Sequence, residues 1–364
     1  MNKKKKIIIA MITFIVLFNI LSWNSTIFCN RYIEYVFPIW TATLGRFMGF
    51  FPFSVGEWLL VIGILMLIFA VIMLIPLLVK KTRRFAKGYY KFFGWTLLFV
   101  CLIMSLNNVV MYHVTPFSER YFGISEKEYT PDQLLQLYND VANKCNELQK
   151  KFERDENGWI IFPEDFEENM KDKAILAMQD LGKTYPQLSG FYPKPKPIFF
   201  SDFMSQEYLL GIFFPFTLEA NYNTAMYEMN LPSTYCHELA HLKGYFFEDE
   251  ANFISYLACV SSDDIYLQYS GYLSVLYYLE EDTWQLSDEY VKQMVEVDSI
   301  VWQDDVFMTP EEWDRIEEDA LLETETVSQV ADTFLDTNLK VNGVQDGMVS
   351  YSQVVKLLLK YYYR

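Results

Sequence analysis

Two histidines and a glutamate in the second half of the chain have the types and spacing of a metal site with its own base. His237 and His241 are four positions apart, and Glu238 follows the first of them directly, in the pattern HExxH. On a helix, residues four apart lie on one face with Cβ atoms roughly 5–6 Å apart, so both imidazoles can bind one metal ion. Neutral imidazoles suit Zn²⁺, and Glu238 would lie beside the position where water binds. Because the chain has only three histidines, an accidental pattern is a poor explanation.

A catalytic metal site needs a third protein ligand, and the residues after this helix offer two. Gly244 is expected to take the left-handed conformation that ends the helix and turns the chain back. An acidic side chain a few positions later can then return to the metal, and both Glu248 and Glu250 are in range. The apolar spacing after Glu248 indicates a second helix, which would carry Glu248 in its first turn and Asn252 one turn later on the same face.

Residues 237–252 resemble the gluzincin group of zinc peptidases, whose third ligand is a glutamate at the head of the second helix. The resemblance implies that Glu248 is the third ligand and that Asn252 steadies a histidine by a hydrogen bond. Only six residues separate His241 from Glu248, fewer than in many gluzincins, so Glu250 stays the alternative third ligand.

A larger part of the chain resembles one bacterial family, the domain-of-unknown-function family 3810. The resemblance lies in the metal motif and in segments 51–54, 215–223, 269–273 and 347–351. Members of that family combine N-terminal membrane helices with the metal motif. The resemblance therefore implies a membrane-anchored zincin, that is, a gluzincin-like zinc metallopeptidase.

The charges divide the 364-residue chain into two halves. Residues 1–113 contain 12 of the 30 Lys and Arg residues but only two of the 47 Asp and Glu residues, which leaves 18 basic and 45 acidic residues for 114–364. An acidic domain of this size repels polynucleotides, so we expect no nucleic acid partner. The five cysteines are spaced neither as a zinc knuckle nor as a disulfide framework, and Cys236 and Cys259 are interpreted as small buried side chains.

Three apolar runs predict an α-helical membrane domain over residues 1–113. The expected spans are about 7–27, 58–79 and 92–112, and runs of about 20 residues can cross a hydrocarbon core of ~30 Å. The lysines at 3–6 and the basic loop 80–87 fall on the same side of a three-pass path, and the positive-inside rule makes that side cytoplasmic. We therefore expect a protein of the cell membrane with the lipid bilayer as a partner, its N-terminus cytoplasmic and residues 114–364 extracytoplasmic.

The second half is expected to be a mainly α, α+β, zincin-like domain with a small edge sheet before the metal helix. Thr130 and Gln133 form a capping box for a helix to about residue 152, and a second helix is expected from about 165 to 181. Aromatic and β-branched residues predict strands at 198–200 and 208–214. Helices are also expected at 257–279 and after Thr309.

Segment 216–223, just before the metal helix, is a candidate substrate rim. Glu219, Asn221 and Asn223 lie in it, and a free strand edge there could pair with an extended peptide. The alternative is an Asn-rich turn between a strand and a helix. Tyr269 and Tyr272 are candidates for stabilising an oxyanion, although in so tyrosine-rich a domain packing is the better explanation for any one tyrosine.

These features predict a membrane-anchored zinc metallopeptidase that binds one Zn²⁺ ion and hydrolyses peptide bonds outside the cytoplasm. His237, His241 and Glu248 would hold the ion, and Glu238 would activate the water. The alternative is a non-catalytic membrane receptor or assembly factor with a structural zinc site, in which Cys236 or Glu250 closes the coordination as a fourth ligand. A metal-dependent hydrolase of lipid or cell-wall amides would share the mechanism and differ in the shape of its cleft.

Overall fold

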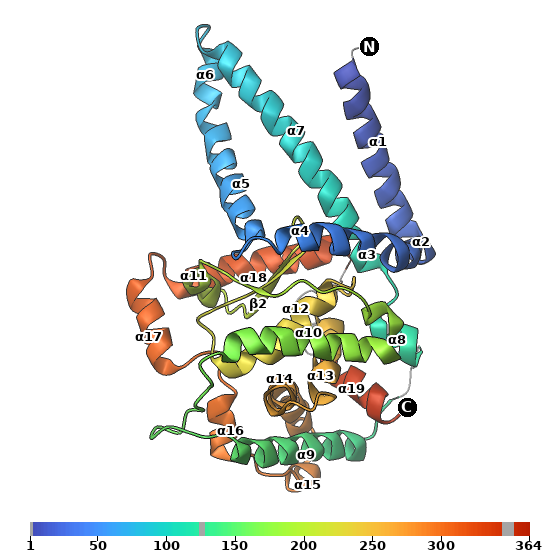
Figure 1. Ribbon diagram of the computed structural model, residues 1–364, viewed down its shortest axis with the longest axis vertical. Helices are drawn as coiled ribbons and strands as arrows, with labels where there is room; N and C mark the ends of the chain where they lie inside the picture. Colours follow the sequence, from blue (N-terminus) through green and yellow to red (C-terminus); the bar gives the residue numbers. More distant parts are fainter. Residues whose placement is uncertain (1–2, 124–127, 344–352) are drawn as a thin grey trace. The chain divides into compact units, whose positions relative to one another are not determined.

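The computed structural model describes residues 3–123, 128–343 and 353–364 (Figure 1). The family-like segment 347–351 lies outside these residues. The chain divides into two compact units: Met1–Val114 with Phe214–Glu219, and Thr115–Phe213 with Ala220–Arg364. We call the first the apolar unit and the second the polar unit. The short segment Phe214–Glu219, far along the sequence, belongs with the N-terminal helices.

The apolar unit contains three helices that are long and apolar enough to cross a membrane: Lys3–Asn24, Val55–Leu78 and Arg83–His113. The first is α1, the second consists of α5 (Val55–Ile72) and α6 (Leu74–Leu78), and the third consists of α7 (Arg83–Asn107) and a 3₁₀ turn (Val109–His113). Their aliphatic and aromatic side chains are largely exposed, as expected for surfaces that face lipid. The three predicted apolar helices are thus confirmed; each begins before its predicted start, and the first ends at Asn24 rather than at about residue 27.

Polar contacts also connect these apolar helices. Asn19 Nδ2 of α1 donates to Ser105 Oγ of α7 at 2.8 Å, which is the kind of interhelical bond that joins helices in an apolar surrounding.

Residues 26–48, between α1 and α5, form short helices joined by wider π turns at Tyr32–Val36 and Thr41–Gly45. These helices are α2 (Thr26–Arg31), α3 (Phe37–Trp40) and α4 (Arg46–Met48).

The polar unit is mainly helical. Its helices are α8 (Phe117–Phe122), α9 (Pro131–Leu148), α10 (Phe166–Thr184), α11 (Ser201–Gln206), α12 (Leu231–His241), α13 (Glu248–Val260), α14 (Ile265–Trp284), α15 (Asp288–Val291), α16 (Ser299–Asp304), α17 (Pro310–Asp319), α18 (Thr324–Val341) and α19 (Val354–Tyr362). Short 3₁₀ turns lie at Gln149–Lys151, Pro186–Leu188 and Glu228–Asn230.

The predicted helix starts follow their capping signals. Thr130 and Gln133 form both bonds of the capping box at the start of α9, and Thr309 Oγ1 accepts the backbone N–H of Glu312 at the start of α17. The second helix after the metal motif begins at Glu248, as predicted. Gly244 has a φ of 92°, which confirms the left-handed turn between the two helices.

Helix α12 is the centre of the polar unit and packs against α10, α13 and α14 (Figure 1). Large side chains without solvent exposure fill the space between these helices, among them Tyr235, Phe253, Tyr256 and Tyr269. Burying one such side chain contributes about 1.5–3 kcal/mol, so this packing holds the metal-motif helix firmly in place. Helix α19 adds Val354, Val355, Leu358 and Leu359 to the core and packs on α13 and α14.

A small sheet accompanies these helices. Its strands are β1 (Lys196–Pro197), β2 (Gly211–Phe214) and β3 (Glu219–Tyr222), in the order β1-β3-β2. Strands β1 and β3 are parallel, with Lys196 opposite Asn221 and Pro197 opposite Tyr222. The combination of mainly helices with one small sheet before α12 agrees with the predicted fold class at this level.

Two predicted elements were wrong. Residues 198–200 are not a strand, because Ser201 Oγ bonds the carbonyl of Ile198 and the chain turns there into α11. The predicted helix 257–279 is interrupted at 261–264, where the Asp264 carboxylate caps a new helix, α14, by accepting the N–H groups of Tyr266 and Leu267. In both places a side-chain hydrogen bond to the backbone outweighs the pattern of apolar residues.

Candidate metal centre

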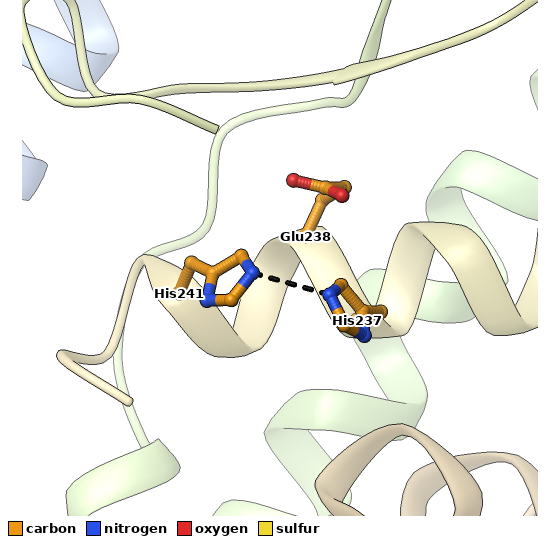
Figure 2. Close-up of side chains that lie close together, drawn as sticks. All are labelled: His237, Glu238 and His241. Carbon is orange, nitrogen blue, oxygen red and sulfur yellow. Dashed lines mark hydrogen bonds between the residues drawn. The ribbon is translucent and has the colours of Figure 1, made fainter. Parts of the chain in front are cut away.

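Helix α12 presents His237 and His241 on one side, one turn apart. Their Nε2 atoms lie 3.1 Å apart, and Figure 2 shows the two rings turned toward each other with Glu238 beside them. The possible ligand atoms of these three residues all lie within 4.8 Å of one another. The helical spacing therefore does bring the three side chains of the motif together.

Hydrogen bonds fix which nitrogen of each imidazole is available. Nδ1 of His237 lies 2.8 Å from Oδ1 of Asn252, and Nδ1 of His241 lies 2.8 Å from the carbonyl oxygen of Tyr245. Since both oxygens can only accept, each Nδ1 carries the proton and donates it. Each Nε2 of a neutral imidazole is then left with a lone pair, which is the form that binds a metal.

Glu248 completes this arrangement from the first position of α13. Its Oε2 lies 3.0 Å from Nε2 of His237 and 3.9 Å from Nε2 of His241. Together with the 3.1 Å between the two nitrogens, these distances form a triangle of three electron-pair donors. In a tetrahedral zinc site with bonds of about 2.0–2.1 Å, ligand atoms lie roughly 3.3–3.4 Å apart. Two sides of the triangle are slightly shorter than this and the third is longer, so the three atoms could hold a Zn²⁺ ion after a small adjustment of Glu248.

Glu238 lies next to this triangle in a buried position. Its side chain is 4% exposed, and Oε2 has no hydrogen-bond partner among the described residues. Burial raises the pKa of Glu238 to about 8, with a further increase from the charge of Glu248 and an opposing effect of His237. A buried carboxylate oxygen without a partner is costly, and a shifted pKa at such a position marks a candidate functional residue.

The space for Glu238 depends on Gly211 at the start of β2. A Cβ atom at Gly211 would lie 2.8 Å from Cγ and Cδ of Glu238 and closer still to Oε1. Real Cβ atoms do not approach so closely, so only glycine allows the strand to lie against this carboxylate.

Charges within the triangle are strongly coupled. Burial alone would lower the pKa of His237, but the hydrogen bond and charge of Glu248 outweigh it and raise the pKa to about 9. Burial lowers the pKa of His241 to about 4. Burial raises the pKa of Glu248, but the two histidines lower it by more, so the pKa is below its usual value. Without a bound cation, Nε2 of His237 and Oε2 of Glu248 therefore share a proton. A metal ion would displace that proton when it binds.

The two other candidate ligands make different contacts. The Glu250 carboxylate accepts the backbone N–H of Ser118 at 2.8 Å and its hydroxyl at 2.6 Å. Cys236 is fully buried, and its hydrogen bond with Cys259 together with burial raises the pKa of its thiol. Among the described residues, Glu248 is thus the acidic side chain that lies against both imidazoles.

The residues predicted to form a substrate rim take part in structural hydrogen bonds. Glu219 accepts the N–H groups of Val55 and Gly56 within the apolar unit. Asn221 Nδ2 donates to the carbonyl of Ile212 on β2, and Asn223 Nδ2 donates to Ser205 Oγ and the carbonyl of Leu209. Their role toward a substrate stays a prediction.

The tyrosines predicted to stabilise an oxyanion lie on α14. The Tyr269 hydroxyl donates to Asp304 Oδ2 at 2.6 Å, and Asp304 also pairs with Arg154 at 2.6 Å. The Tyr272 ring lies edge-on to Tyr256 at 5.9 Å. Their catalytic role stays a prediction too, and the hydroxyl of Tyr269 belongs to a buried ion-pair network.

Sequence reasoning missed two contributors to the site. Gly211 gives no local signal, because its partner Glu238 is remote in sequence and the contact depends on the tertiary fold. The Tyr245 carbonyl that orients His241 is a backbone group, which residue types do not reveal. A glycine inside an aromatic and β-branched strand is nevertheless a general sign of close approach, and Gly211 fits that sign.

Comparisons with known proteins agree with the sequence resemblance. The model of the family described as "Protein of unknown function (DUF3810)" matches residues 32–359. No curated protein and no solved structure matches the chain. The match covers parts of both units.

Proposed function

The chain belongs to the DUF3810 family, and we propose that it is a membrane-anchored zinc metallopeptidase with a zincin-like polar unit. The observation that carries the proposal is the triangle of His237 Nε2, His241 Nε2 and Glu248 Oε2, with sides of 3.1, 3.0 and 3.9 Å. Three ligands from two packed helices leave one tetrahedral position for solvent or substrate, as in catalytic rather than structural zinc sites.

The donor set suits zinc in its chemistry as well as in its spacing. Two imidazoles and one carboxylate are a known catalytic zinc set. A Zn²⁺ ion at these residues would supply Lewis acidity, which polarises a scissile carbonyl and lowers the pKa of water toward about 7. Asn252 and the Tyr245 carbonyl would hold the imidazoles in the binding tautomer.

Glu238 is the residue that we assign as the general base. Its buried carboxylate lies beside the histidines, with one oxygen that has no partner in the described part of the chain. A nearby cation lowers the pKa of a carboxyl group, so the value of about 8 would fall and the group would be ionised at neutral pH. Glu238 then accepts a proton from the attacking water and donates it to the leaving amine.

The surroundings of the site argue for an open fourth position. Cys236 and Glu250 could each have closed the coordination, but the free thiol of Cys236 makes a hydrogen bond with Cys259, and the Glu250 carboxylate accepts the hydroxyl of Ser118. This favours the peptidase over the alternative of a receptor or assembly factor with a structural zinc.

The apolar unit would anchor the enzyme in the cell membrane. The positively charged N-terminus and the loop 80–87 favour the cytoplasmic side, which places the polar unit and its site outside. The proposed substrate is a peptide or protein that reaches the site from the extracytoplasmic side.

The direct test compares the wild-type protein with a Glu238→Gln variant. Both are purified in full length, their zinc content is measured, and cleavage of a quenched-fluorescent peptide library is followed. We expect equal zinc content and a loss of cleavage of at least about 100-fold in the variant, the lower range for a lost general base. Undiminished cleavage by the variant would refute the assignment, and zinc that stays bound to a wild type without any hydrolysis would favour the structural role.

A further inference from the structure

The connection between α12 and α13 contains a buried lysine that the proposed reaction does not use. Lys243 follows His241 by two positions and is only 7% exposed. In the described part of the chain no carboxylate pairs with its ammonium group, which makes the burial of this charge costly. The same connection carries the Tyr245 carbonyl that orients His241, and it leads to the third ligand, Glu248.

The ammonium group of Lys243 is bound by backbone carbonyls and an aromatic ring. Its Nζ donates to the carbonyl oxygens of Ser189 at 2.8 Å and Phe191 at 3.1 Å. The Nζ also lies 3.8 Å from the ring centroid of Tyr192, which is the geometry of a cation–π contact. All three partners lie in residues 189–192, so the lysine side chain ties the α12–α13 connection to this one segment.

This segment is in turn fixed to helix α10. A Cβ atom at Gly182 of α10 would lie 2.8 Å from the backbone N and Cα of Ser189, so the two backbones are in direct contact. Gln179 Nε2, also on α10, donates to the carbonyl of Gly190 at 3.3 Å. Because α10 packs against α12 in the core of the polar unit (Figure 1), Lys243 completes a closed path of contacts from α12 through α10 to the α12–α13 connection.

A glycine in the connection makes such an anchor necessary. Gly244 has a φ of 92° and no side chain to pack. Glycine adopts many backbone conformations, so the path of the chain there depends on what holds its two neighbours. Tyr245, on one side, is buried, with its ring edge-on to Phe117 at 5.4 Å. Lys243, on the other side, is held by the segment 189–192.

We propose that Lys243 is a positioning residue for the metal centre: by anchoring the α12–α13 connection to the segment 189–192, it holds the Tyr245 carbonyl against Nδ1 of His241. Its effect on zinc binding and turnover rests on the proposed peptidase function. The geometric part does not, because it concerns a hydrogen bond within the chain, which can be measured in metal-free protein.

The test follows that hydrogen bond in the full chain in lipid nanodiscs, after metal has been removed with a chelator. The chain has only three histidines, so labelling them with ¹⁵N gives a separate signal for each Nδ1–H proton. Exchange of these protons with water is measured for the wild type and for Lys243→Met, which keeps a long side chain and removes its charge. Competition with a chelating dye gives the zinc affinity of each protein.

Lys171→Met is the matched control. Lys171 of α10 is also 7% exposed, and its Nζ also lies near an aromatic ring, 5.2 Å from the ring centroid of Tyr222. Its ammonium group pairs, however, with Glu167 and Glu168 one turn earlier on its own helix. Removing this charge therefore leaves the anchor of the α12–α13 connection in place.

We expect Lys243→Met to speed exchange of the His241 Nδ1–H proton at least about fivefold, as for the loss of one hydrogen bond. Zinc binding should weaken about 10- to 100-fold, the usual effect of losing a partner that orients a metal ligand. Exchange of the His237 proton, which Asn252 accepts, should not change, and Lys171→Met should behave as the wild type. Unchanged exchange at His241 in folded Lys243→Met would overturn the inference, and so would equal acceleration at both histidines, which indicates general loosening.

A second pair of variants covers the case in which Lys243→Met fails to fold. Tyr192→Leu removes the ring that faces the ammonium group, whereas Tyr192→Phe keeps that ring and removes only the hydroxyl, which donates to the carbonyl of Leu188. Only Tyr192→Leu should speed exchange at His241, and equal exchange in the two variants would overturn the inference. Because exchange needs neither zinc nor turnover, it decides the inference even if the protein binds no zinc, an outcome that would overturn the proposed function alone.

Discussion

The backbone of Gly211 lies directly against the carboxylate of Glu238, so closely that no side chain fits between them. The strand thereby covers the proposed base on one side, and the possible ligand atoms of His237 and His241 lie within 4.8 Å of that carboxylate.

A Gly211→Ala substitution should displace Glu238 without removing a metal ligand. The added methyl would lie 2.8 Å from Cγ and Cδ, so either the strand or the carboxylate must move. We expect cleavage to fall roughly 10- to 100-fold with zinc content unchanged, since a shift on the order of 1 Å has this effect. Gly94→Ala, where the new Cβ has no neighbour within 4 Å, is the control. Full activity of Gly211→Ala would argue against a role for Glu238 at this position.

Asn252→Ala should weaken zinc binding although Asn252 is not a ligand. Its amide oxygen accepts the Nδ1 proton of His237 and thereby fixes the tautomer with a free Nε2. Loss of such a bond typically weakens metal affinity by about 10- to 100-fold. Affinity can be measured by competition with a chelating dye. Asn139→Ala is the control, because the Asn139 amide bonds only backbone groups of 293 and 295 in the described contacts. Equal affinities in the two variants would contradict this role.

Zinc affinity should rise with pH up to about 9. The pKa of His237 is raised to about 9 by Glu248, whereas the pKa of His241 is lowered to about 4 by burial, so of the two histidines only His237 carries a proton between these values. Zinc must displace that proton, and below about pH 8 it also favours loss of the proton of Glu238, so the apparent affinity should increase at least about tenfold per pH unit from pH 6 to 9. The same competition assay at several pH values checks this. A flat profile would show that the pair of His237 and Glu248 does not hold the proton.

Asp305, in the turn after α16, should make the protein less stable as pH rises. Burial, with a smaller contribution from Asp304, raises the pKa of Asp305 from 3.8 to about 7. A folded-state pKa above the unfolded one means that the folded state binds the proton better, so stability falls from about pH 4 to about pH 7 and is level above. Asp305→Asn should therefore raise the melting temperature at pH 8 and not at pH 4. A shift of equal size at both pH values would contradict this cause.

Local sequence patterns were enough to predict most residues of the candidate site. The helical repeat brings His237 and His241 together, and the left-handed turn at Gly244 returns the chain so that α13 begins at Glu248. These relations depend on neighbours in sequence, which periodicity and turn chemistry describe well. The three apolar helices followed from composition for the same reason.

The rest depends on contacts between remote segments. Gly211 touches Glu238, and Glu219 holds α5, through the tertiary path of a short hairpin that no local signal fixes. The turn at 198–200 and the break at 261–264 were missed because side-chain bonds from Ser201 and Asp264 override apolar spacing. The run Ser261-Ser262-Asp263-Asp264 is itself a turn signal, so this break in the helix could have been predicted from the sequence.

The most direct measurement is zinc K-edge X-ray absorption of the purified full-length protein, together with its zinc content. The account predicts one zinc per chain, bound by two imidazole nitrogens, one carboxylate and one solvent oxygen, and lost on Glu248→Ala but retained on Glu250→Ala. A sulfur neighbour from Cys236, four protein ligands, or a zinc content that does not change on Glu248→Ala would contradict it.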